Sequence, residues 1–523
     1  MGARREELTA HPVVSPRLGY GDCSMLFEPS IYQLNIFEWI AHGSGHAVVN
    51  AVAGSGKSTT LVEAAKRLPP AQSAVFIAFN NHVVAELGTR LQGTTMKAKT
   101  LHSIGMQSLY RRLPKVQNPD TRKYYKIART LVERAYPYDT REQQHQNAQH
   151  LAKLVGLARL TLTDPRSESG LLSIAHRYLE DFARPLVKLV GMILETGMMQ
   201  ADKVGLIDFT DMIYLPVRWS LPLPQYDWVF ADEIQDFNAC QVEIALKTLK
   251  PGGRFLGVGD PRQSIMAFAG ADDLSFEKVK ERLLAEELPL DICYRCPTTH
   301  IELAQKIVPQ IRARKDAPEG KVIPVKTDEA LELVKDGDLV ICRSTAPVVA
   351  QCIQLIERGV KARVRGRDVA QMLVDLVKAV EAMPKFKFKA FSKFLDKFAT
   401  FQLQALRDEE GSEGKIESFT DRVAAVRACY AKYGPQCKSV NELNQYIEDL
   451  FSDEKSGVWL STIHRAKGLE SNRVVILQYN RLPLYWKEQH EFEAVQEENL
   501  LYVALTRARQ ELILVSSEKG KAN

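Results

Sequence analysis

The sequence predicts an α/β protein made of two parallel-sheet lobes, each carrying an inserted, mainly helical subdomain. The first observation behind this prediction is a glycine-rich phosphate loop that stands between an apolar run and a helical segment. The second is that short apolar runs, typical of buried strands, resume after a long helical stretch. The third is a further set of such runs around a second helical stretch.

The order of these runs divides the 523-residue chain into five parts. Each lobe is built from two separate stretches, because an insert interrupts it. The predicted parts are a flexible N-terminal tail at 1–24, a first, ATP-binding lobe at 25–103 and 204–288, a helical insert at 104–203, a second lobe at 289–365 and 456–523, and a reduced helical insert at 366–455.

The predicted strands are short apolar runs bounded by turn residues or by helical composition. In the first lobe they cover 46–52, 74–79, 227–231 and 254–259. In the second lobe they cover 322–325, 338–342, 458–462, 473–477 and 511–515, and none of these is followed by a phosphate loop. The first lobe is therefore expected to cradle the nucleotide and the second to support it.

The glycine-rich stretch from Ala51 to Thr60 follows a buried-strand run and leads directly into a helix. Glycines let backbone N–H groups close on an anion, and a helix N-terminus adds partial positive charge. Lys57 is expected to reach the terminal phosphates, and the Ser58 hydroxyl to bind Mg²⁺. Ala51 stands where the generic pattern has its first glycine.

Two adjacent carboxylates, Asp232 and Glu233, follow the strand predicted at 227–231. Paired buried carboxylates are costly unless something binds them. A magnesium ion on Asp232 would relieve this cost, and Glu233 would then orient or deprotonate the attacking water. The alternative is a helix N-terminus rich in acids. Gln263 follows the next strand and is expected to face the same nucleotide, at the crevice where open α/β sheets bind ligands.

Basic and aromatic residues are mixed between Lys97 and Arg129, where nine Lys or Arg accompany one acid, Asp120. Tyr110, Tyr124 and Tyr125 lie among them, as in surfaces that track phosphates and stack bases. A solvated helix face is the equally weighted alternative. By contrast, the helical spacing of a second aromatic group predicts a core-facing stripe formed by Phe391, Phe394, Leu395 and Phe398.

Composition excludes few functions. The net charge of +5 is too small to identify a partner. Cysteines are sparse, which suits a reducing compartment. Cys293 and Cys296 have no second pair at metal spacing, so two small buried thiols are expected rather than zinc ligands. No apolar run is long enough to cross a bilayer, and the N-terminus lacks a secretory core segment.

Taken in order, the motifs resemble those of superfamily 1 DNA helicases of the UvrD/Rep type, whose phosphate loop also has alanine in place of the first glycine. The whole pattern is similar to the helicase core of the F-box DNA helicases, although no F-box is seen. The motifs that carry the resemblance are Ala53–Ser58, Asp232–Asp236, Gly259–Ile265, Cys293–Arg295, Ser461–Glu470 and Tyr502–Ala508.

This resemblance implies two RecA-like lobes of the P-loop NTPase class and a role for each motif residue. Phosphates would be cradled by Ala53, Gly54, Ser55, Gly56, Lys57, Ser58 and Thr59. Gln33 would read the adenine, Tyr294 would stack on it and Glu470 would contact the ribose. Gln263 would sense the γ-phosphate, and Arg295 and Arg507 would be arginine fingers. The single strand would be lined by Phe79, Asn81, His102, Phe268, Thr462 and His464.

Some positions depart from the family pattern. Met266 and Ala269 replace an aromatic residue and an arginine that are common in the third motif. Phe268 stands where many members have tryptophan, and Cys293 where they have asparagine. The insert at 366–455 is shorter than in typical members, which leaves its regulatory role and its engagement of duplex open.

The expected function is therefore an ATP- and Mg²⁺-dependent translocase on single-stranded DNA that unwinds duplexes in repair, recombination or replication. Its 3′→5′ polarity rests on resemblance alone. Expected partners are single strands, junctions with duplex and repair proteins, with no membrane. A nucleoid-associated monomer in the cytoplasm is expected, with oligomers on DNA left open. The alternatives are a motor that strips proteins from DNA, a 5′→3′ helicase, an ATP-gated scaffold without catalysis, and an RNA track.

Overall fold

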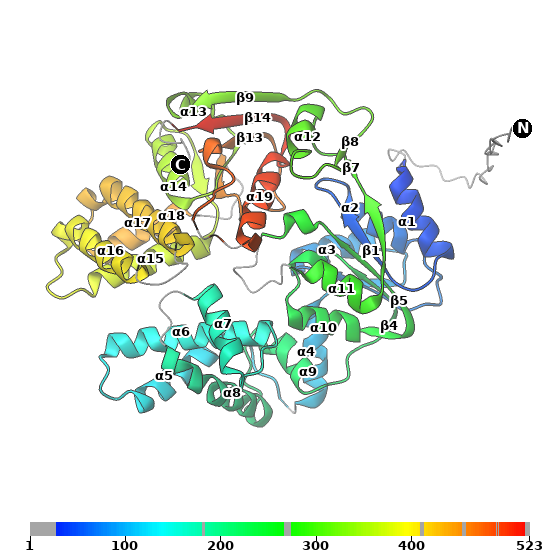
Figure 1. Cartoon of the computed structure of the whole chain (residues 1–523), viewed down its shortest axis with the longest axis horizontal. Helices are drawn as coiled ribbons and strands as arrows, with labels where there is room; N and C mark the ends of the chain where they lie inside the picture. Colours follow the sequence, from blue (N-terminus) through cyan, green and yellow to red (C-terminus); the bar gives the residue numbers. More distant parts are fainter. Residues whose placement is uncertain are drawn as a thin grey trace, which may run out of the picture.

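Two six-stranded parallel sheets and two groups of helices make up the computed structural model (Figure 1). The structure describes residues 28–113, 115–179, 184–265, 274–407, 413–451, 457–487, 489 and 491–517. The predicted N-terminal tail lies outside these residues. The predicted α/β fold class with parallel sheets is confirmed. Among the described helices, none combines the length and apolar character that a membrane crossing requires.

The first sheet has the strand order β3-β2-β4-β5-β1-β6, and every pair in it is parallel. Its strands are β1 (Ala47–Ala51), β2 (Ala74–Ala78), β3 (Met96–Thr100), β4 (Tyr226–Ala231), β5 (Leu249–Gly259) and β6 (Glu286–Leu290). The helices that accompany it are α1 (Ile31–His42), α2 (Lys57–Ala65), α3 (Asn81–Arg90), α4 (Leu101–Arg112), α9 (Asp211–Arg218), α10 (Ala239–Lys247) and α11 (Ser275–Leu283).

Both faces of this sheet are buried, so its central strands read as continuous apolar runs. Successive side chains point to opposite faces. Val48 and Val229 belong to one hydrophobic cluster, whereas Val49 and Phe230 belong to the cluster on the other face. The carboxyl ends of β4, β5 and β1 are neighbours in the sheet order, which brings the three motifs that follow them to one edge.

The first helical insert contains α5 (Lys123–Ala135), α6 (Arg141–Leu160), α7 (Glu168–Tyr178) and α8 (Val190–Val204). Its apolar side chains form one continuous cluster with a face of the first sheet, in which Leu154 and Ile193 share the core with Val75. The insert is therefore packed as an extension of the first lobe. In Figure 1 it lies below the two sheets, in cyan and green.

The second sheet has the order β11-β12-β10-β13-β14-β9, again parallel throughout. Its strands are β9 (Lys321–Lys326), β10 (Leu339–Cys342), β11 (Ala362–Val364), β12 (Val458–Thr462), β13 (Ser471–Ile476) and β14 (Ala508–Ser516). The accompanying helices are α12 (Thr298–Ala304), α13 (Thr327–Leu333), α14 (Thr345–Glu357) and α19 (Glu491–Leu505), and a small sheet pairs β7 (Ile292–Cys293) with β8 (Arg312–Ala313).

The second helical insert consists of α15 (Arg367–Glu381), α16 (Phe391–Arg407), α17 (Glu413–Tyr433) and α18 (Val440–Leu450). It shares a hydrophobic cluster with one face of the second sheet. The stripe predicted on α16 faces this core: Phe391 and Leu395 are fully buried, and Phe394 and Phe398 pack against the cluster. The core prediction for these four side chains is confirmed.

Two of the expected part boundaries cut well into elements, and a third, at 203/204, falls just before the last residue of α8. The boundary at 103/104 lies within α4, whose Ile104 and Leu109 belong to the core cluster of the first sheet. The boundary at 288/289 lies within β6, which pairs with β1 along its whole length. At both places the element continues across the expected boundary and stays packed on the first sheet.

The sequence does not predict the two short strands β7 and β8, nor three strands of the six-stranded sheets, each of which lies at an edge of its sheet: β3, β6 and β11. In β3 only Met96 and Thr100 are buried, whereas Lys97 is exposed and Lys99 is half-buried. In β6 two glutamates and a proline are exposed. Edge strands carry polar residues that blunt pairing with other chains, and these residues hide the apolar signal.

A buried charge network ties α5 and α6 to the start of α9. Asp211 is fully buried and accepts hydrogen bonds from Lys123 Nζ at 2.6 Å, Tyr124 Oη at 2.9 Å and Arg159 Nη1 at 2.9 Å. Arg159 also forms a bidentate pair with Asp208, with both distances 2.8 Å. Breaking a buried ion pair leaves an uncompensated charge, which is strongly destabilising.

We expect Asp211→Ala to lower the opening free energy of the first insert by about 3–5 kcal/mol, because Lys123 would be left buried without its acceptor. Hydrogen-exchange protection of the α5 and α6 amides measures this. The control is Asp202→Ala in the same insert, which removes a half-exposed ion pair with Arg112 and should cost less than about 1 kcal/mol. Equal protection in the two variants would contradict a stabilising role for the network.

Candidate active site

The glycine loop joins β1 to α2 and lies against the segment that follows β7. Gly54 and Gly56 have φ values of 67° and 79°, a left-handed region that favours glycine. A Cβ on Gly54 would stand 2.8 Å from Cβ of Arg295 and 2.9 Å from Sγ of Cys293. The Gly54 carbonyl accepts a hydrogen bond from the Tyr294 amide at 2.9 Å. The loop is thus closely covered by the second-lobe motif.

Lys57, Ser58, Asp232 and Glu233 meet at the edge of the first sheet. Lys57 Nζ lies 3.2 Å from Oε1 of Glu233, and the Ser58 hydroxyl donates to Oδ2 of Asp232 at 3.0 Å. The Glu233 amide donates to Oδ1 of Asp232 at 2.9 Å. Glu233 has a left-handed backbone, with φ of 54°, and such strain in a non-glycine residue is typical of functional sites.

The three titratable groups, Lys57, Asp232 and Glu233, shift one another's pKa values. Burial and the neighbouring Glu233 raise the pKa of Asp232 to about 6. Burial also raises the pKa of Glu233, but attraction to Lys57 and Lys467 outweighs this effect and lowers the pKa to about 2. Burial alone would lower the pKa of Lys57, yet the carboxylates of Glu233, Asp260 and Asp232 raise it. Lys57 is therefore a cation and Glu233 an anion at neutral pH.

Gln263 lies beside this cluster, at the end of the η3 turn (Pro261–Gln263). Its Nε2 donates to Oδ2 of Asp260 at 2.6 Å. Its carbonyl accepts from Nζ of Lys467 at 2.6 Å, and Lys467 also pairs with Asp236, with 2.5 Å between Nζ and Oδ2. Lys467 belongs to the second lobe, so this buried ion pair joins the two lobes beside the phosphate loop.

The residues predicted at the adenine end lie close together. Gln33 is buried and donates from Nε2 to the Thr60 hydroxyl at 2.9 Å. Its Oε1 accepts from the Ser30 amide at 2.9 Å and from the Tyr294 hydroxyl at 3.4 Å. Tyr294 is 37% exposed, so part of this residue is open to solvent.

The two predicted finger arginines lie on the second-lobe side of the loop and are held by protein acceptors. Arg295 Nε lies 2.5 Å from Oε2 of Glu470, and its Nη1 donates to the Thr506 carbonyl at 3.1 Å. Arg507 is buried and donates from Nε to the Val503 carbonyl at 2.8 Å. Burial and the neighbouring Arg295 lower the pKa of Arg507 to about 10, so it remains charged at neutral pH.

The residues predicted to contact the strand fall in two groups. Phe79 and Asn81 are exposed just after β2, and Phe79 is 54% exposed. His102, Thr462 and His464 are half-buried. Burial lowers the pKa of His102, and burial with Arg343 lowers that of His464 to about 3, so both rings are neutral. Phe268 lies outside the described residues.

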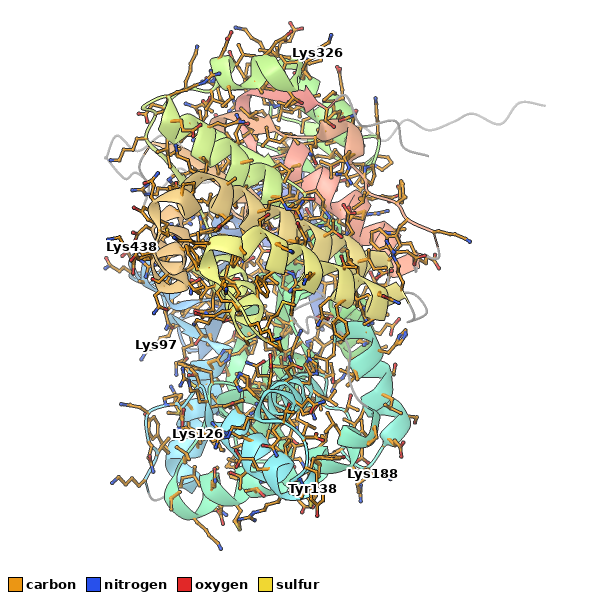
Figure 2. The ribbon with its side chains drawn as sticks, turned by 90° about the vertical axis from the view of Figure 1, so that its left-hand side faces the viewer. Lys97, Lys126, Tyr138, Lys188, Lys326 and Lys438 are labelled. Carbon is orange, nitrogen blue, oxygen red and sulfur yellow. The ribbon has the colours of Figure 1, made fainter. Side chains whose placement is uncertain are left out.

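The basic stretch from Lys97 to Arg129 is mixed in character. Lys97 and Lys126 extend outward on the same side of the molecule (Figure 2), and Tyr110 is 61% exposed. Tyr124, however, is buried and bonded to Asp211. Its interpretation as a candidate stacking ring is wrong, because its hydroxyl completes the buried charge network.

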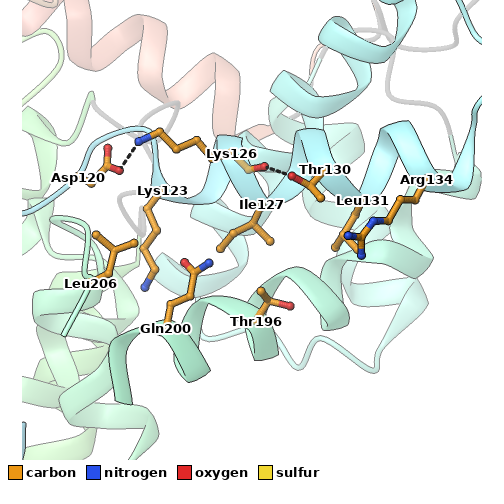
Figure 3. A pocket seen from close by; sticks show the side chains of 10 residues that line it. All are labelled: Asp120, Lys123, Lys126, Ile127, Thr130, Leu131, Arg134, Thr196, Gln200 and Leu206. Atoms are coloured by element: carbon orange, nitrogen blue, oxygen red, sulfur yellow. Dashed lines mark hydrogen bonds and ion pairs between the residues drawn. The ribbon is translucent and has the colours of Figure 1, made fainter. Parts of the chain in front are cut away.

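A cavity of about 290 Å³ lies in the first insert, between α5 and α8 and away from the residues of the active site. Lys126 and Thr130 line it from α5, and Thr196 and Gln200 from α8 (Figure 3). None of the predicted site residues lines this cavity. The nucleotide site is thus defined by converging motif residues rather than by this cavity.

Two site residues lie in recognised motifs but were given no role from the sequence. Lys467 forms the ion pair with Asp236 described above. Tyr502 is fully buried, and its hydroxyl accepts from the Ala53 amide at 2.8 Å. Their positions in the motifs indicate that they lie near the site. Their contacts cannot be predicted from local sequence, because Asp236 is 231 residues from Lys467 and Ala53 is 449 residues from Tyr502.

The parallel sheets, the glycine loop after β1 and the acidic pair after β4 define a P-loop NTPase. Residues 35–283 match the family model of the UvrD/REP helicase N-terminal domain, and residues 457–515 match that of the UvrD-like helicase C-terminal domain. The chain therefore belongs to the UvrD/Rep-type DNA helicases of superfamily 1, which are ATP-dependent enzymes.

Two relatives agree with this family. YjcD of Bacillus subtilis (strain 168), named as an ATP-dependent DNA helicase, is 22% identical over 612 residues, which cover 92% of this chain and 78% of that protein. An ATP-dependent helicase/nuclease subunit from Carboxydothermus hydrogenoformans is 28% identical over 182 residues. That second match covers 33% of this chain and 15% of the relative.

The raised pKa of Asp232 predicts a pH-dependent cost to folding. Its value of about 6 lies above the ordinary 3.8, so folding favours the protonated form. The stability gained from protonated Asp232 is fully present below about pH 4 and is lost as the pH rises through about 6. Asp232→Asn is permanently neutral and should stabilise the nucleotide-free enzyme by on the order of 1–3 kcal/mol at pH 7. Thermal unfolding between pH 5 and 8 measures the difference, which should grow with pH.

The control is Asp227→Asn at the start of the same strand. Hydrogen bonds from Ser73 and Lys250 lower the pKa of Asp227 to about 2, so its ionised form is the favoured one at neutral pH. That variant should lower the unfolding temperature at pH 7. A loss of stability in Asp232→Asn as well would show that the carboxylate of Asp232 is not under electrostatic strain.

Proposed function

We propose that this enzyme is a translocase on single-stranded DNA that unwinds duplexes with 3′→5′ polarity, driven by ATP hydrolysis at the Lys57 site. The observation that carries the proposal is the convergence of both lobes on the phosphate loop. Tyr294 and Tyr502 of the second lobe bond to Gly54 and Ala53 of the first. A nucleotide there would contact both lobes at once, so its arrival and departure would change their separation.

The proposed hydrolysis depends on positioning and charge. The loop amides and Lys57 bind the phosphates, and Glu233 orients the attacking water. A γ-phosphate competes with Glu233 for Lys57, which frees the carboxylate to act on the water. Arg295 and Arg507 supply positive charge from the second lobe, and such arginine fingers contribute about 10³–10⁵ in rate. Gln263 reports the γ-phosphate to the lobe interface through Lys467.

The oxygen donors at the loop fit a magnesium ion. The Ser58 hydroxyl and Asp232 Oδ2 lie 3.0 Å apart. Burial and the neighbouring Glu233 raise the pKa of Asp232, so a bound cation would favour its ionised form. We propose that Ser58 and Asp232 hold the ion together with phosphate oxygens. When bound, it neutralises charge that develops on the phosphates.

For the DNA side, we propose a track formed by Phe79, Asn81, His102 and Phe268 of the first lobe and by Thr462 and His464 of the second. Phe79 offers an exposed ring, and base stacking on such rings is independent of sequence. Neutral His102 and His464 contribute hydrogen bonds rather than charge. A track shared by two lobes moves the strand when the lobes separate and close, and this work on DNA belongs in the cytoplasm, at the nucleoid.

We also propose the division of the chain into two lobes with two inserts. The parallel sheets support it, with the first lobe continued to Leu290 so that it includes β6. The helices α5–α8 and α15–α18 are the inserts, and each is packed on its own sheet.

Duplexes with one single-stranded tail test the proposed function. We expect unwinding of a substrate with a 3′ tail and none with a 5′ tail or blunt ends, measured by strand displacement with ATP and Mg²⁺. Glu233→Gln should bind ATP but hydrolyse it about 10²–10⁴-fold more slowly. Unwinding from 5′ tails alone would reverse the polarity. Removal of bound protein filaments without strand displacement would identify a protein-stripping motor instead.

Phe79→Ala tests the strand track. Loss of one stacking ring should weaken single-strand affinity by about 1–3 kcal/mol, and it should leave ATP hydrolysis without DNA unchanged. Phe401→Ala is the matched control, because Phe401 is 71% exposed on the second insert. Fluorescence anisotropy with a labelled oligonucleotide measures both variants. Equal affinity of Phe79→Ala and the parent would remove Phe79 from the track.

A further inference from the structure

Tyr502 is a buried tyrosine that reaches from the second lobe to the phosphate loop of the first. It lies near the carboxyl end of α19, the helix that lies between the two lobes in Figure 1. Its ring is fully buried in a small cluster with Val52 and Ala53 of the loop region and Cys293 and Cys296 of the facing segment. This cluster contains residues of both lobes, including Val52 and Ala53 beside the glycine loop.

The hydroxyl of Tyr502 makes two hydrogen bonds, both to the first lobe. It accepts from the Ala53 amide at 2.8 Å and donates to Oδ2 of Asp260 at 3.4 Å. The same Asp260 oxygen accepts from Nε2 of Gln263 at 2.6 Å. Burial and Asp260 raise the pKa of Tyr502 well above its ordinary value, so the hydroxyl keeps its proton and remains a donor. The Tyr502 hydroxyl therefore contacts both the phosphate loop and Asp260, which is the hydrogen-bond partner of Gln263.

The backbone of Tyr502 is connected to Arg507 on the other side. The Thr506 hydroxyl donates to the Tyr502 carbonyl at 2.9 Å, and Arg507 Nη2 donates to the Thr506 hydroxyl at 3.0 Å. The Thr506 carbonyl accepts from Nη1 of Arg295 at 3.1 Å. The end of α19 and the residues after it, 502–507, thus include Tyr502, which bonds to the phosphate loop, and Thr506, which accepts hydrogen bonds from Arg295 and Arg507.

We propose that Tyr502 is a positioning residue that sets the placement of Arg507 relative to the phosphate loop and links it to the Asp260–Gln263 pair. A phenylalanine would fill the same apolar space, so packing alone does not explain the hydroxyl. Its two hydrogen bonds fix the distance between the end of α19 and the loop. A shift of Gln263 on binding or loss of the γ-phosphate is passed through Asp260 to Tyr502, and from there to Arg507. This inference rests on the proposed function of Arg507.

The test is Tyr502→Phe, which keeps the ring and removes the hydroxyl. We expect kcat for DNA-stimulated ATP hydrolysis to fall about 10–100-fold, since a misplacement of about 1 Å costs up to that much. KM for ATP should change less than about threefold, because the groups that bind the nucleotide remain in place. The matched control is Tyr124→Phe, which removes another buried tyrosine hydroxyl, bonded to Asp211 in the first insert. It should lower the unfolding temperature and leave hydrolysis without DNA unchanged.

A double-mutant cycle separates positioning from a merely structural role. If Tyr502 acts through Arg507, Tyr502→Phe should reduce kcat less than about twofold further in an Arg507→Ala background, since residues of one unit are non-additive. Full additivity, or a kcat loss in Tyr502→Phe that only follows a lowered unfolding temperature, would overturn the inference. Normal hydrolysis by Tyr502→Phe alongside an inactive Arg507→Ala would overturn it while leaving the proposed function intact. Normal hydrolysis by Arg507→Ala would overturn the finger assignment itself.

Discussion

The pairing of Lys57 with Glu233 is the interaction on which the arrangement of the site depends. Burial alone would lower the pKa of Lys57, but the carboxylates of Asp232, Glu233 and Asp260 outweigh this effect and raise it. The carboxylates in turn are tolerated at a buried sheet edge only because Lys57 and Lys467 lie beside them. Strands β1, β4 and β5 must therefore be neighbours, and each must end in its polar motif. The sheet order satisfies this requirement. In the proposed function, a phosphate takes the place of Glu233 as the ion-pair partner of Lys57.

The two lobes meet through polar contacts made at this same place. Lys467 pairs with Asp236, Tyr294 bonds to the loop backbone, and Tyr502 bonds to Ala53. Buried hydrogen bonds and ion pairs are directional, so they define one relative position of the lobes better than apolar contacts do. These contacts lie next to the groups proposed to act on a phosphate, since Lys467 also donates to the carbonyl of Gln263. In the proposed function, binding at the site and movement of the lobes are therefore coupled.

The helical inserts are continuous with the lobes that carry them. The first insert shares its hydrophobic cluster with the first sheet, and the second insert shares one with the second sheet. The network around Asp211 adds a polar connection between α5, α6 and α9. Each insert is packed on one sheet. In the proposed function, movement of a lobe would therefore carry its insert with it and displace the exposed surfaces of the two inserts relative to each other.

The sequence by itself determined the local chemistry: the glycine loop with Lys57 and Ser58, the acids after β4, and the central strands. These follow from short-range rules, because a buried parallel strand is apolar throughout and a phosphate loop needs glycine at positive φ. Only the tertiary structure decided what depends on distant neighbours. The edge strands β3, β6 and β11 are defined by their pairing partners rather than by composition. Tyr124 is buried instead of exposed because Asp211 accepts its hydroxyl. The role of Tyr502 emerges only where the fold brings it to Ala53.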